Sequence, residues 1–271
     1  GWNKLPRLTS TSFNLGTRRG STTYTPAATS ATSSRTVSLN NGMRRFQNFL
    51  TEELDSLEDY LTQFENAIKS THDRVNMNGH TMFTPKHQNP VLQNKMIVSC
   101  FHGDEPAGWL GLLEFVKNYN TENVNVTYLP IISEDAFRTG NHLNMPNRNP
   151  NQRIPHDPSD EMRAFLSLID MWLPLASGGF LDLHEDPYRD EAYVFSWSDM
   201  DGLTDRMVKN LSQFFPLFAG GILTEDPQDM LGEYMAKNGV CPSITHETPV
   251  LDHSIDKRIN ATIRAIMEFL T

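Results

Sequence analysis

Two histidines and two glutamates of this chain follow predicted strands and carry groups that bind metal ions or move protons. His102 and Glu105 leave the apolar run 97–101, and His184 and Glu247 come at the ends of two further short apolar runs. Open α/β sheets place their ligand sites at the carboxyl ends of strands. The sequence therefore predicts that these four side chains meet at one edge of a sheet.

The first two of these residues form the pattern H-x-x-E. A histidine and a glutamate three residues apart can turn toward one point, as two ligands of one zinc ion must do. The pattern alone is weak, because a chain with nine histidines produces it by chance about half the time. Catalytic zinc typically takes three protein ligands and leaves a fourth position open. His102, Glu105 and His184 supply such a set, so we expect one Zn²⁺ per chain.

Two carboxylates are placed to support that centre. Glu247, at its own strand end, can act as general base, taking the proton of the attacking water and returning it to a leaving amine. Asp182 lies two residues before His184 on the same predicted strand, so both side chains point to the same side. An unpaired buried acid would be costly, which favours a role for Asp182 in orienting the imidazole.

A long loop is expected over 133–157, because this segment is dense in Asn, Pro and Arg and has no periodicity. The guanidinium group suits a carboxylate or a developing oxyanion, and the amide of asparagine adds uncharged donors. In a chain of net charge −10, this cluster predicts an anionic group on the substrate; the alternative is a solvated polar loop. The residues concerned are Arg138, Arg148 and Arg153, interleaved with Asn141, Asn144, Asn147, Asn149 and Asn151.

The elements that must position these residues alternate between strands and helices. This order predicts an α/β fold with a central mixed, mostly parallel sheet and helices on both faces. Residues 71–94 predict loops or a short hairpin. Strands are expected at 95–101, 124–132, 180–183, 193–196 and 241–245, and helices at 42–69, 106–119, 160–175, 203–215, 230–238 and 254–270.

The domain organisation follows from composition. Ten of the sixteen residues in 21–36 are Ser or Thr, and such a stretch cannot bury enough surface to fold alone. We expect a tail or strap over 1–40, through which a homo-oligomer could form, and a single catalytic domain over 41–271.

Charge and cysteine content limit the partners and the compartment. The net charge of −10 argues against nucleic acid and anionic membranes as partners, and no apolar run approaches the length of a membrane-spanning helix. Only two cysteines occur, so a disulfide framework is excluded and a reducing, cytoplasmic setting fits best. The first residues show no hydrophobic signal-peptide core.

The chain resembles the M14-type zinc carboxypeptidases over about residues 93–271. Asp-Leu-His and Glu-Thr-Pro are typical of the succinylglutamate desuccinylase/aspartoacylase branch of that family. The motifs that carry the resemblance occur in the family's order: His102-x-x-Glu105, Asn147-Arg148, Asp182-Leu183-His184 and Glu247-Thr248-Pro249.

The resemblance implies a central mixed eight-stranded sheet and one zinc ion. It implies that His102, Glu105 and His184 bind this zinc and that Glu247 is the general base.

The resemblance also suggests how a substrate would be held. Asn147 and Arg148 match the pair that grips the substrate's terminal carboxylate, and Arg138 matches an arginine that polarises the scissile carbonyl. Digestive carboxypeptidases carry a tyrosine well before the catalytic glutamate, whereas Tyr234 lies only thirteen residues before Glu247, so Tyr234 is left without a role.

The expected function is a zinc metallopeptidase of carboxypeptidase type that hydrolyses an amide bond next to a free carboxylate. The substrate is a small peptide or an acyl amino acid. An N-acyl amino acid deacylase is the main alternative; a single helix over 254–270, in place of the β-rich C-terminal domain usual in the aspartoacylase branch, favours the carboxypeptidase. A non-catalytic carboxylate-binding module and a structural protein that uses its tail are further alternatives.

Overall fold

The computed structural model describes residues 56–121, 123–144, 147–225 and 228–271. The predicted tail 1–40 and the first part of the helix expected at 42–69 lie outside these residues. The helices are α2 (Leu57–Ile68), α3 (Pro106–Asn118), α4 (Glu134–Thr139), α5 (Asp160–Leu166), α6 (Ile169–Leu175), α7 (Leu203–Leu211), α8 (Leu231–Lys237) and α9 (Ile255–Leu270). The strands are β1 (His72–Met77), β2 (His80–Pro85), β3 (Asn94–Ser99), β4 (Asn125–Leu129), β5 (Phe180–Asp186), β6 (Ala192–Ser198), β7 (Leu217–Leu223) and β8 (Ser243–Pro249).

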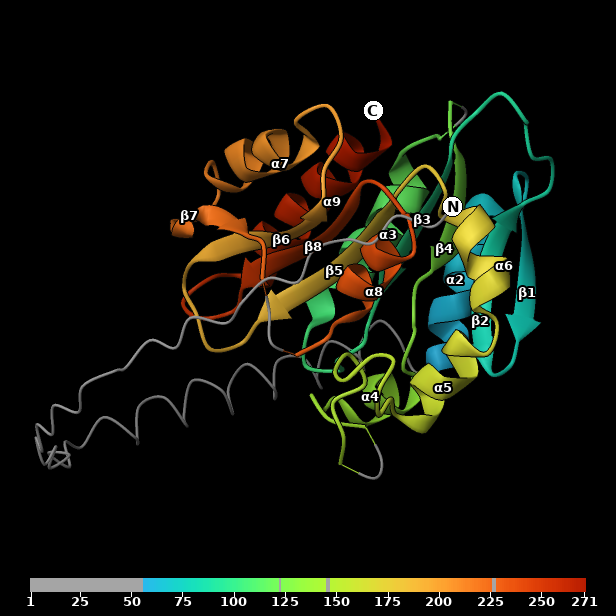
Figure 1. Cartoon of the computed structure of the whole chain (residues 1–271), viewed down its shortest axis with the longest axis horizontal. Helices are drawn as coiled ribbons and strands as arrows, with labels where there is room; N and C mark the ends of the chain where they lie inside the picture. Colours follow the sequence, from blue (N-terminus) through green and yellow to red (C-terminus); the bar gives the residue numbers. More distant parts are fainter. Residues whose placement is uncertain (1–55, 122, 145–146, 226–227) are drawn as a thin grey trace, which may run out of the picture. The chain divides into compact units, whose positions relative to one another are not determined.

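Within the described residues, eight strands form one sheet in the order β1-β2-β4-β3-β5-β8-β6-β7 (Figure 1). The four central strands β4, β3, β5 and β8 run parallel, and β7 runs parallel to β6. The pairs β1–β2, β2–β4 and β6–β8 are antiparallel. The expected mixed, mostly parallel sheet of eight strands is thus confirmed.

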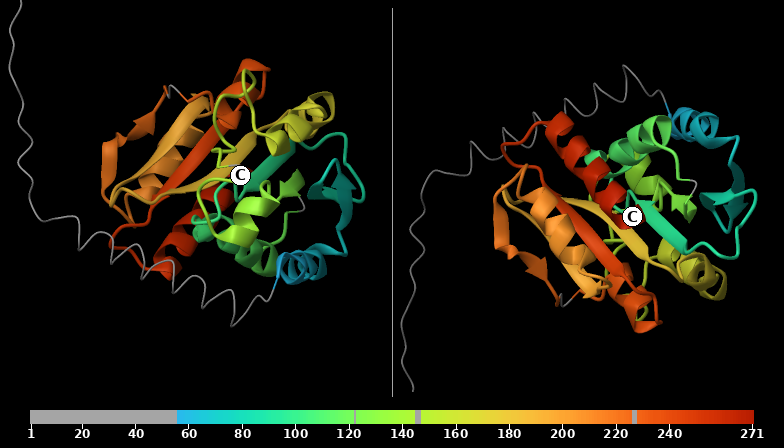
Figure 2. Two further views of the ribbon diagram at one scale, coloured as in Figure 1. Left: turned by 90° about the horizontal axis from the view of Figure 1, so that it is seen from below. Right: turned by 90° about the horizontal axis from the view of Figure 1, so that it is seen from above.

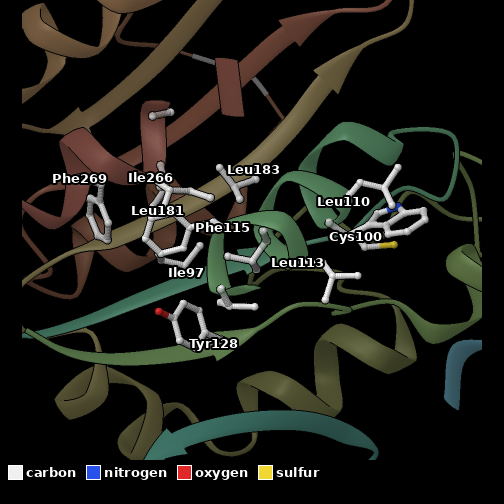
Figure 3. Close-up of a cluster of buried hydrophobic side chains, with 14 of the residues drawn as sticks. Ile97, Cys100, Leu110, Leu113, Phe115, Tyr128, Leu181, Leu183, Ile266 and Phe269 are labelled. Atoms are coloured by element: carbon white, nitrogen blue, oxygen red, sulfur yellow. The ribbon is translucent and has the colours of Figure 1, made fainter. Parts of the chain in front are cut away.

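Helices cover both faces of this sheet (Figure 2). On one face, α2, α3, α7 and α9 pack over an apolar core in which Leu181 and Leu183 of β5 meet Ile266 of α9 (Figure 3). On the other face, α5, α6 and α8 contribute to a second apolar cluster that contains Phe180 and Trp172. Because side chains alternate along a strand, β5 sends Leu181 and Leu183 to the first face and its even-numbered residues to the second.

Several predicted boundaries were wrong, and local hydrogen bonds accompany two of them. The segment 133–157 begins with α4 rather than a loop, because Ser133 Oγ accepts from Ala136 N at 3.2 Å and Gly140 ends the helix with φ 64°. The helix expected at 160–175 is two helices, and at the break the carbonyl of Phe165 accepts from Leu168 N at 3.0 Å and from Trp172 Nε1 at 2.7 Å.

The sequence reading also missed β7, a short edge strand that contains Gly220 and Gly221. Both glycines have positive φ, and glycine weakens a strand pattern in the sequence. Among the described residues, no helix has the length and apolar character needed to cross a membrane.

The turn between β3 and α3 packs closely against α4. The N–H of Gly103 donates to the carbonyl of Asn141 at 2.7 Å. A Cβ atom at position 103 would lie 1.8 Å from the carbonyl oxygen of Ala136. Only glycine fits here, so the turn that carries His102 and Glu105 is held against α4 by backbone contact.

Gly103→Ala should therefore lower the free energy of unfolding by about 3 kcal/mol, because the new methyl group must displace backbone atoms. Gly79→Ala is the control: its Cβ meets nothing within 4 Å, and its φ of +86° adds a backbone strain of about 1 kcal/mol. Urea unfolding of both variants makes the comparison. An equal or smaller loss in Gly103→Ala would show that the turn moves freely.

Candidate metal centre and active site

His184 and Glu247 lie near the carboxyl ends of two neighbouring parallel strands. We expected them to follow their strands, but β5 continues to Asp186 and β8 to Pro249, so both residues lie within strands. They are paired in register. Side chains of directly paired residues point to the same face of a sheet, so the two are neighbours on the face that α5, α6 and α8 cover.

His102 and Glu105 lie in the turn that follows β3. Cys100 has φ 57°, a left-handed conformation that turns the chain away from the strand. Glu105 is the residue that precedes the first turn of α3, where Pro106 begins the helix. Its side chain makes no capping hydrogen bond to that helix, and its carboxylate is directed to two imidazoles instead.

The carboxylate of Glu105 lies between the Nδ1 atoms of two histidines. His102 Nδ1 is 2.6 Å from Glu105 Oε1, and His184 Nδ1 is 2.8 Å from Glu105 Oε2. The same Oε2 accepts from the backbone N–H of Glu185 at 3.1 Å. The three predicted ligands, which come from two separate parts of the sequence, therefore meet in a buried cluster.

The electrostatics of this cluster favour charged groups. Burial alone would favour the protonated acid, but the charges of His102 and His184 hold the pKa of Glu105 below its usual range. Burial likewise opposes a charge on His184, whereas the carboxylates of Asp182 and Glu105 together raise its pKa well above the usual value. A carboxylate that stays ionised is what a divalent cation requires of a ligand.

The far nitrogen of each imidazole is also held. His102 Nε2 lies 2.9 Å from Asn149 Oδ1, and His184 Nε2 lies 3.1 Å from Asp182 Oδ2 and 2.9 Å from Asn151 Nδ2. If a metal ion took up both Nδ1 atoms, a proton on each Nε2 would donate to Asn149 Oδ1 and Asp182 Oδ2, while the Asn151 amide donates to Asp182 Oδ2 at 3.3 Å. Two imidazole nitrogens and a carboxylate are a donor set that fits zinc.

A third histidine, which the sequence reading did not select, lies in the same cluster. His142 stacks on His102 with ring centroids 3.7 Å apart, and its Nδ1 lies 3.5 Å from Glu105 Oε1 and 3.2 Å from Asp104 Oδ1. Donor atoms of His102, Glu105 and His142 all lie within 4.8 Å of one another. His142 is thus a second candidate for the third ligand position.

Two observations favour His184 over His142 as that ligand. The Nδ1 of His184 is nearer to the Glu105 carboxylate, and its ring is fully buried and held at Nε2 by Asp182. His142 is 28% exposed. Burial opposes a charge on His142, but the hydrogen bond to Asp104 and the nearby carboxylate of Glu105 raise its pKa, as Asp182 and Glu105 do for His184, so the choice between the two rests on geometry and burial.

The candidate base Glu247 is buried beside the cluster. Burial raises its pKa well above the usual range; the charge of His184 opposes this, and the carboxylates of Glu105, Asp186 and Asp182 reinforce it. The raised proton affinity makes this carboxylate, once ionised, a stronger proton acceptor.

The predicted substrate-binding residues lie at the surface of the loop that follows α4. The Arg148 guanidinium lies 2.8 Å from the carboxylate of Asp157, and Asn147 is exposed with φ 70°. Arg138 is on α4, 60% exposed, with its guanidinium 3.4 Å from Glu134. The carboxylate-binding and carbonyl-polarising roles of these residues stay predictions.

The sequence reading assigned Asn149 and Asn151 to the substrate as amide donors, but here they face imidazoles. Asn151 is buried, and its Oδ1 accepts from Leu231 N of α8 at 2.9 Å. No spacing in the sequence marks these contacts, because the loop and the two strands are joined only by the fold.

No known family model and no curated protein matches this sequence. Solved structures do match. A candidate metallopeptidase from Shewanella denitrificans is 22% identical, with a TM-score of 0.72 over 79% of this chain and 88% of that chain. A metallo-carboxypeptidase from Pseudomonas aeruginosa in complex with (2-guanidinoethylmercapto)succinic acid is 16% identical, with a TM-score of 0.60 over 79% and 68%.

A succinylglutamate desuccinylase from Silicibacter is 17% identical to this chain, with a TM-score of 0.50 over 70% of this chain and 59% of that chain. These structures include both branches that the motifs resemble. At such identities the likeness establishes a shared fold, which is the fold that the sequence motifs implied.

His246, the residue before Glu247, points to the opposite face of β8 and is fully buried. Neither of its ring nitrogens has a hydrogen-bond partner in the described part of the chain. Burial lowers its pKa to about 3, so the folded chain holds this imidazole neutral over most of the acidic range.

This histidine should make the fold sensitive to acid. Below about pH 6.5, His246 is protonated in the unfolded chain but stays neutral in the folded chain. The free energy of unfolding therefore falls by about 1.4 kcal/mol for each pH unit until the pH reaches the pKa of His246 in the folded chain. His246→Leu should remove this contribution, and His87→Leu, at an exposed position, is the control. Urea unfolding at pH 7 and pH 4.5 tests it: an unchanged pH dependence in His246→Leu would refute this origin.

Proposed function

We propose that this chain is a zinc metallopeptidase of carboxypeptidase type that hydrolyses an amide bond next to a free carboxylate. The observation that carries the proposal is the meeting of two imidazole Nδ1 atoms on the buried carboxylate of Glu105, with Glu247 beside them on the next strand. The metallopeptidase and carboxypeptidase structures that share the fold support it.

In this proposal His102, Glu105 and His184 would hold one zinc ion. When bound, zinc would lower the pKa of a water molecule toward ~7 and polarise the carbonyl under attack. Asn149 and Asp182 keep the two rings oriented through their Nε2 atoms.

Glu247 is the proposed proton carrier. Its buried carboxylate accepts the proton of the attacking water and delivers it to the amine nitrogen as the amide bond breaks. Because Glu247 is paired in register with His184, the strand pairing holds the base at a constant position beside the metal ligands.

The substrate's free carboxylate is proposed to bind Arg148 and Asn147. The Arg148 guanidinium is paired with the carboxylate of Asp157, so a substrate carboxylate would have to displace Asp157 from it. Arg138 is proposed to stabilise the oxyanion, which requires its guanidinium to leave Glu134. The succinic acid derivative bound by the Pseudomonas carboxypeptidase supports a carboxylate-bearing substrate.

An N-acyl amino acid deacylase is the second candidate, favoured by the shared fold of the Silicibacter desuccinylase. Both reactions use the same zinc site and differ in the acyl group that is removed. We further propose that the reaction takes place in the cytoplasm, since both cysteines are free.

Replacing the base tests the mechanism. Glu247→Gln should retain one zinc per chain and lose about 10²–10⁴-fold in kcat, because the amide cannot accept the proton. Glu114→Gln on α3, at a half-exposed position, is the matched control and should retain wild-type kcat. Metal analysis is combined with hydrolysis of N-blocked dipeptides of varied C-terminal residue and of N-acyl amino acids.

The same assay separates the two candidate functions. Faster hydrolysis of dipeptides supports the carboxypeptidase, and faster hydrolysis of acyl amino acids supports the deacylase. Near wild-type kcat in Glu247→Gln would refute the proposed proton carrier.

Arg148→Met should raise KM for carboxylate-bearing substrates about 10–100-fold while kcat changes little, because a charge-assisted hydrogen bond contributes about 1.5–3 kcal/mol. Asp157→Asn should lower KM, since it removes the carboxylate that competes for the guanidinium. Arg163→Met, which removes an exposed pair with Asp160, is the control. An unchanged KM in Arg148→Met would assign the substrate carboxylate to another residue.

A further inference from the structure

Helix α3 begins without a cap from its own N-terminal residue. The first backbone N–H groups of a helix have no partner within the helix and usually bond to the side chain of the N-cap residue. Glu105 occupies that position, but its carboxylate faces His102 and His184. A second acceptor must therefore serve the start of α3, or the helix would draw the Glu105 carboxylate away from the imidazoles.

Glu185, on the neighbouring strand β5, is that acceptor. Its carboxylate Oε2 accepts from the backbone N–H of Ala107 at 2.6 Å. In return, the backbone N–H of Glu185 donates to Glu105 Oε2 at 3.1 Å. The two glutamates thus exchange roles: the side chain of Glu185 caps the helix, and its main chain holds the side chain of Glu105.

The carboxylate of Glu185 is fully buried and needs compensation for its charge. Arg258 of α9 supplies it through a hydrogen bond from Nη1 to Glu185 Oε1, and Thr248 Oγ1 donates to the same oxygen at 3.4 Å. Helix α9 lies beside α3 on one side of the sheet (Figure 2), so the guanidinium reaches Glu185 from the face opposite to His184.

Glu185 links the three elements that carry the site, because it belongs to β5 and its carboxylate accepts hydrogen bonds from α3 and β8. Ala107 lies two residues after Glu105, and Glu185 lies one residue after His184. Thr248 lies one residue after Glu247, the predicted base. A shift of Glu185 would therefore move the helix start and both strands relative to one another.

We propose that Glu185 and Arg258 are positioning residues of the metal centre, which keep the Glu105 carboxylate free for the metal by capping α3 in its place. This inference rests on the proposed function, since it concerns how the metal ligands are held. Neither residue is among the proposed zinc ligands or substrate-binding residues.

If the Glu185–Arg258 pair only stabilised the fold, its replacement would change zinc affinity no more than it changed stability. Replacing both members of a buried ion pair with apolar residues of similar volume is often neutral or stabilising. Such a double replacement removes the helix cap while it avoids an unpaired charge, so stability and site geometry can be measured separately.

The experiment compares Glu185→Gln, the double variant Glu185→Leu with Arg258→Met, and Arg258→Lys, at a temperature where each is folded by circular dichroism. Zinc affinity is measured by competition with a chromophoric chelator, alongside the thermal midpoint, kcat and KM. We expect zinc Kd to rise about 10–100-fold in the double variant, even where this variant retains the wild-type midpoint. Glu185→Gln should lose less affinity, because its amide oxygen can still accept from Ala107, and Arg258→Lys, which keeps a cation at Glu185, should retain most of the wild-type affinity.

The matched control is Arg206→Ala, which breaks another ion pair of α9, to Glu268 at 3.2 Å, and should leave zinc Kd unchanged. Wild-type Kd in the double variant would overturn the positioning role and leave the proposed function intact. A wild-type chain that binds no zinc would instead overturn the proposed function, and with it this inference.

Discussion

The buried carboxylate of Glu105 is the group on which the geometry of this site depends. A carboxylate out of contact with water needs donors or positive charge around it, and here the nearest partners are the imidazoles of His102 and His184 and one backbone N–H. These partners come from the turn after β3 and from β5, so the charge can be satisfied only when both elements are in place. Because the buried charge needs these partners, the atoms that a metal ion would bind lie close together.

Side chains alternate between the two faces of the sheet along each strand, and this alternation determines which residues reach the Glu105 carboxylate. On β5, Asp182 and His184 point to one face, whereas Leu181 and Leu183 enter the apolar core beneath α3 and α9. Glu185 points to that core side as well and needs Arg258 as a partner there. One short strand therefore carries the proposed ligand His184, the proposed orienting residue Asp182 and Glu185, whose side chain caps α3. A shift of one residue in register would exchange the two faces.

Much of this arrangement was predictable from the sequence, because strong local signals marked it. The apolar run before His102, the proline that opens α3 and the alternation around His184 gave the strands, the helix and the common edge. The contacts of His142, Asn149 and Asn151 were not predictable, since they depend on how the loop after α4 folds back over the strands. Glu185 and Arg258 are seventy-three residues apart, and no local pattern connects them.

The central claim is that His102, Glu105 and His184 together form a zinc site. The most direct test is a crystal structure of the zinc-loaded chain with anomalous diffraction at the zinc edge. We expect one zinc ion bonded to Nδ1 of His102, to the Glu105 carboxylate and to Nδ1 of His184, with His142 outside the coordination shell. Zinc bonded to His142 in place of His184, or no zinc at Glu105, would contradict it.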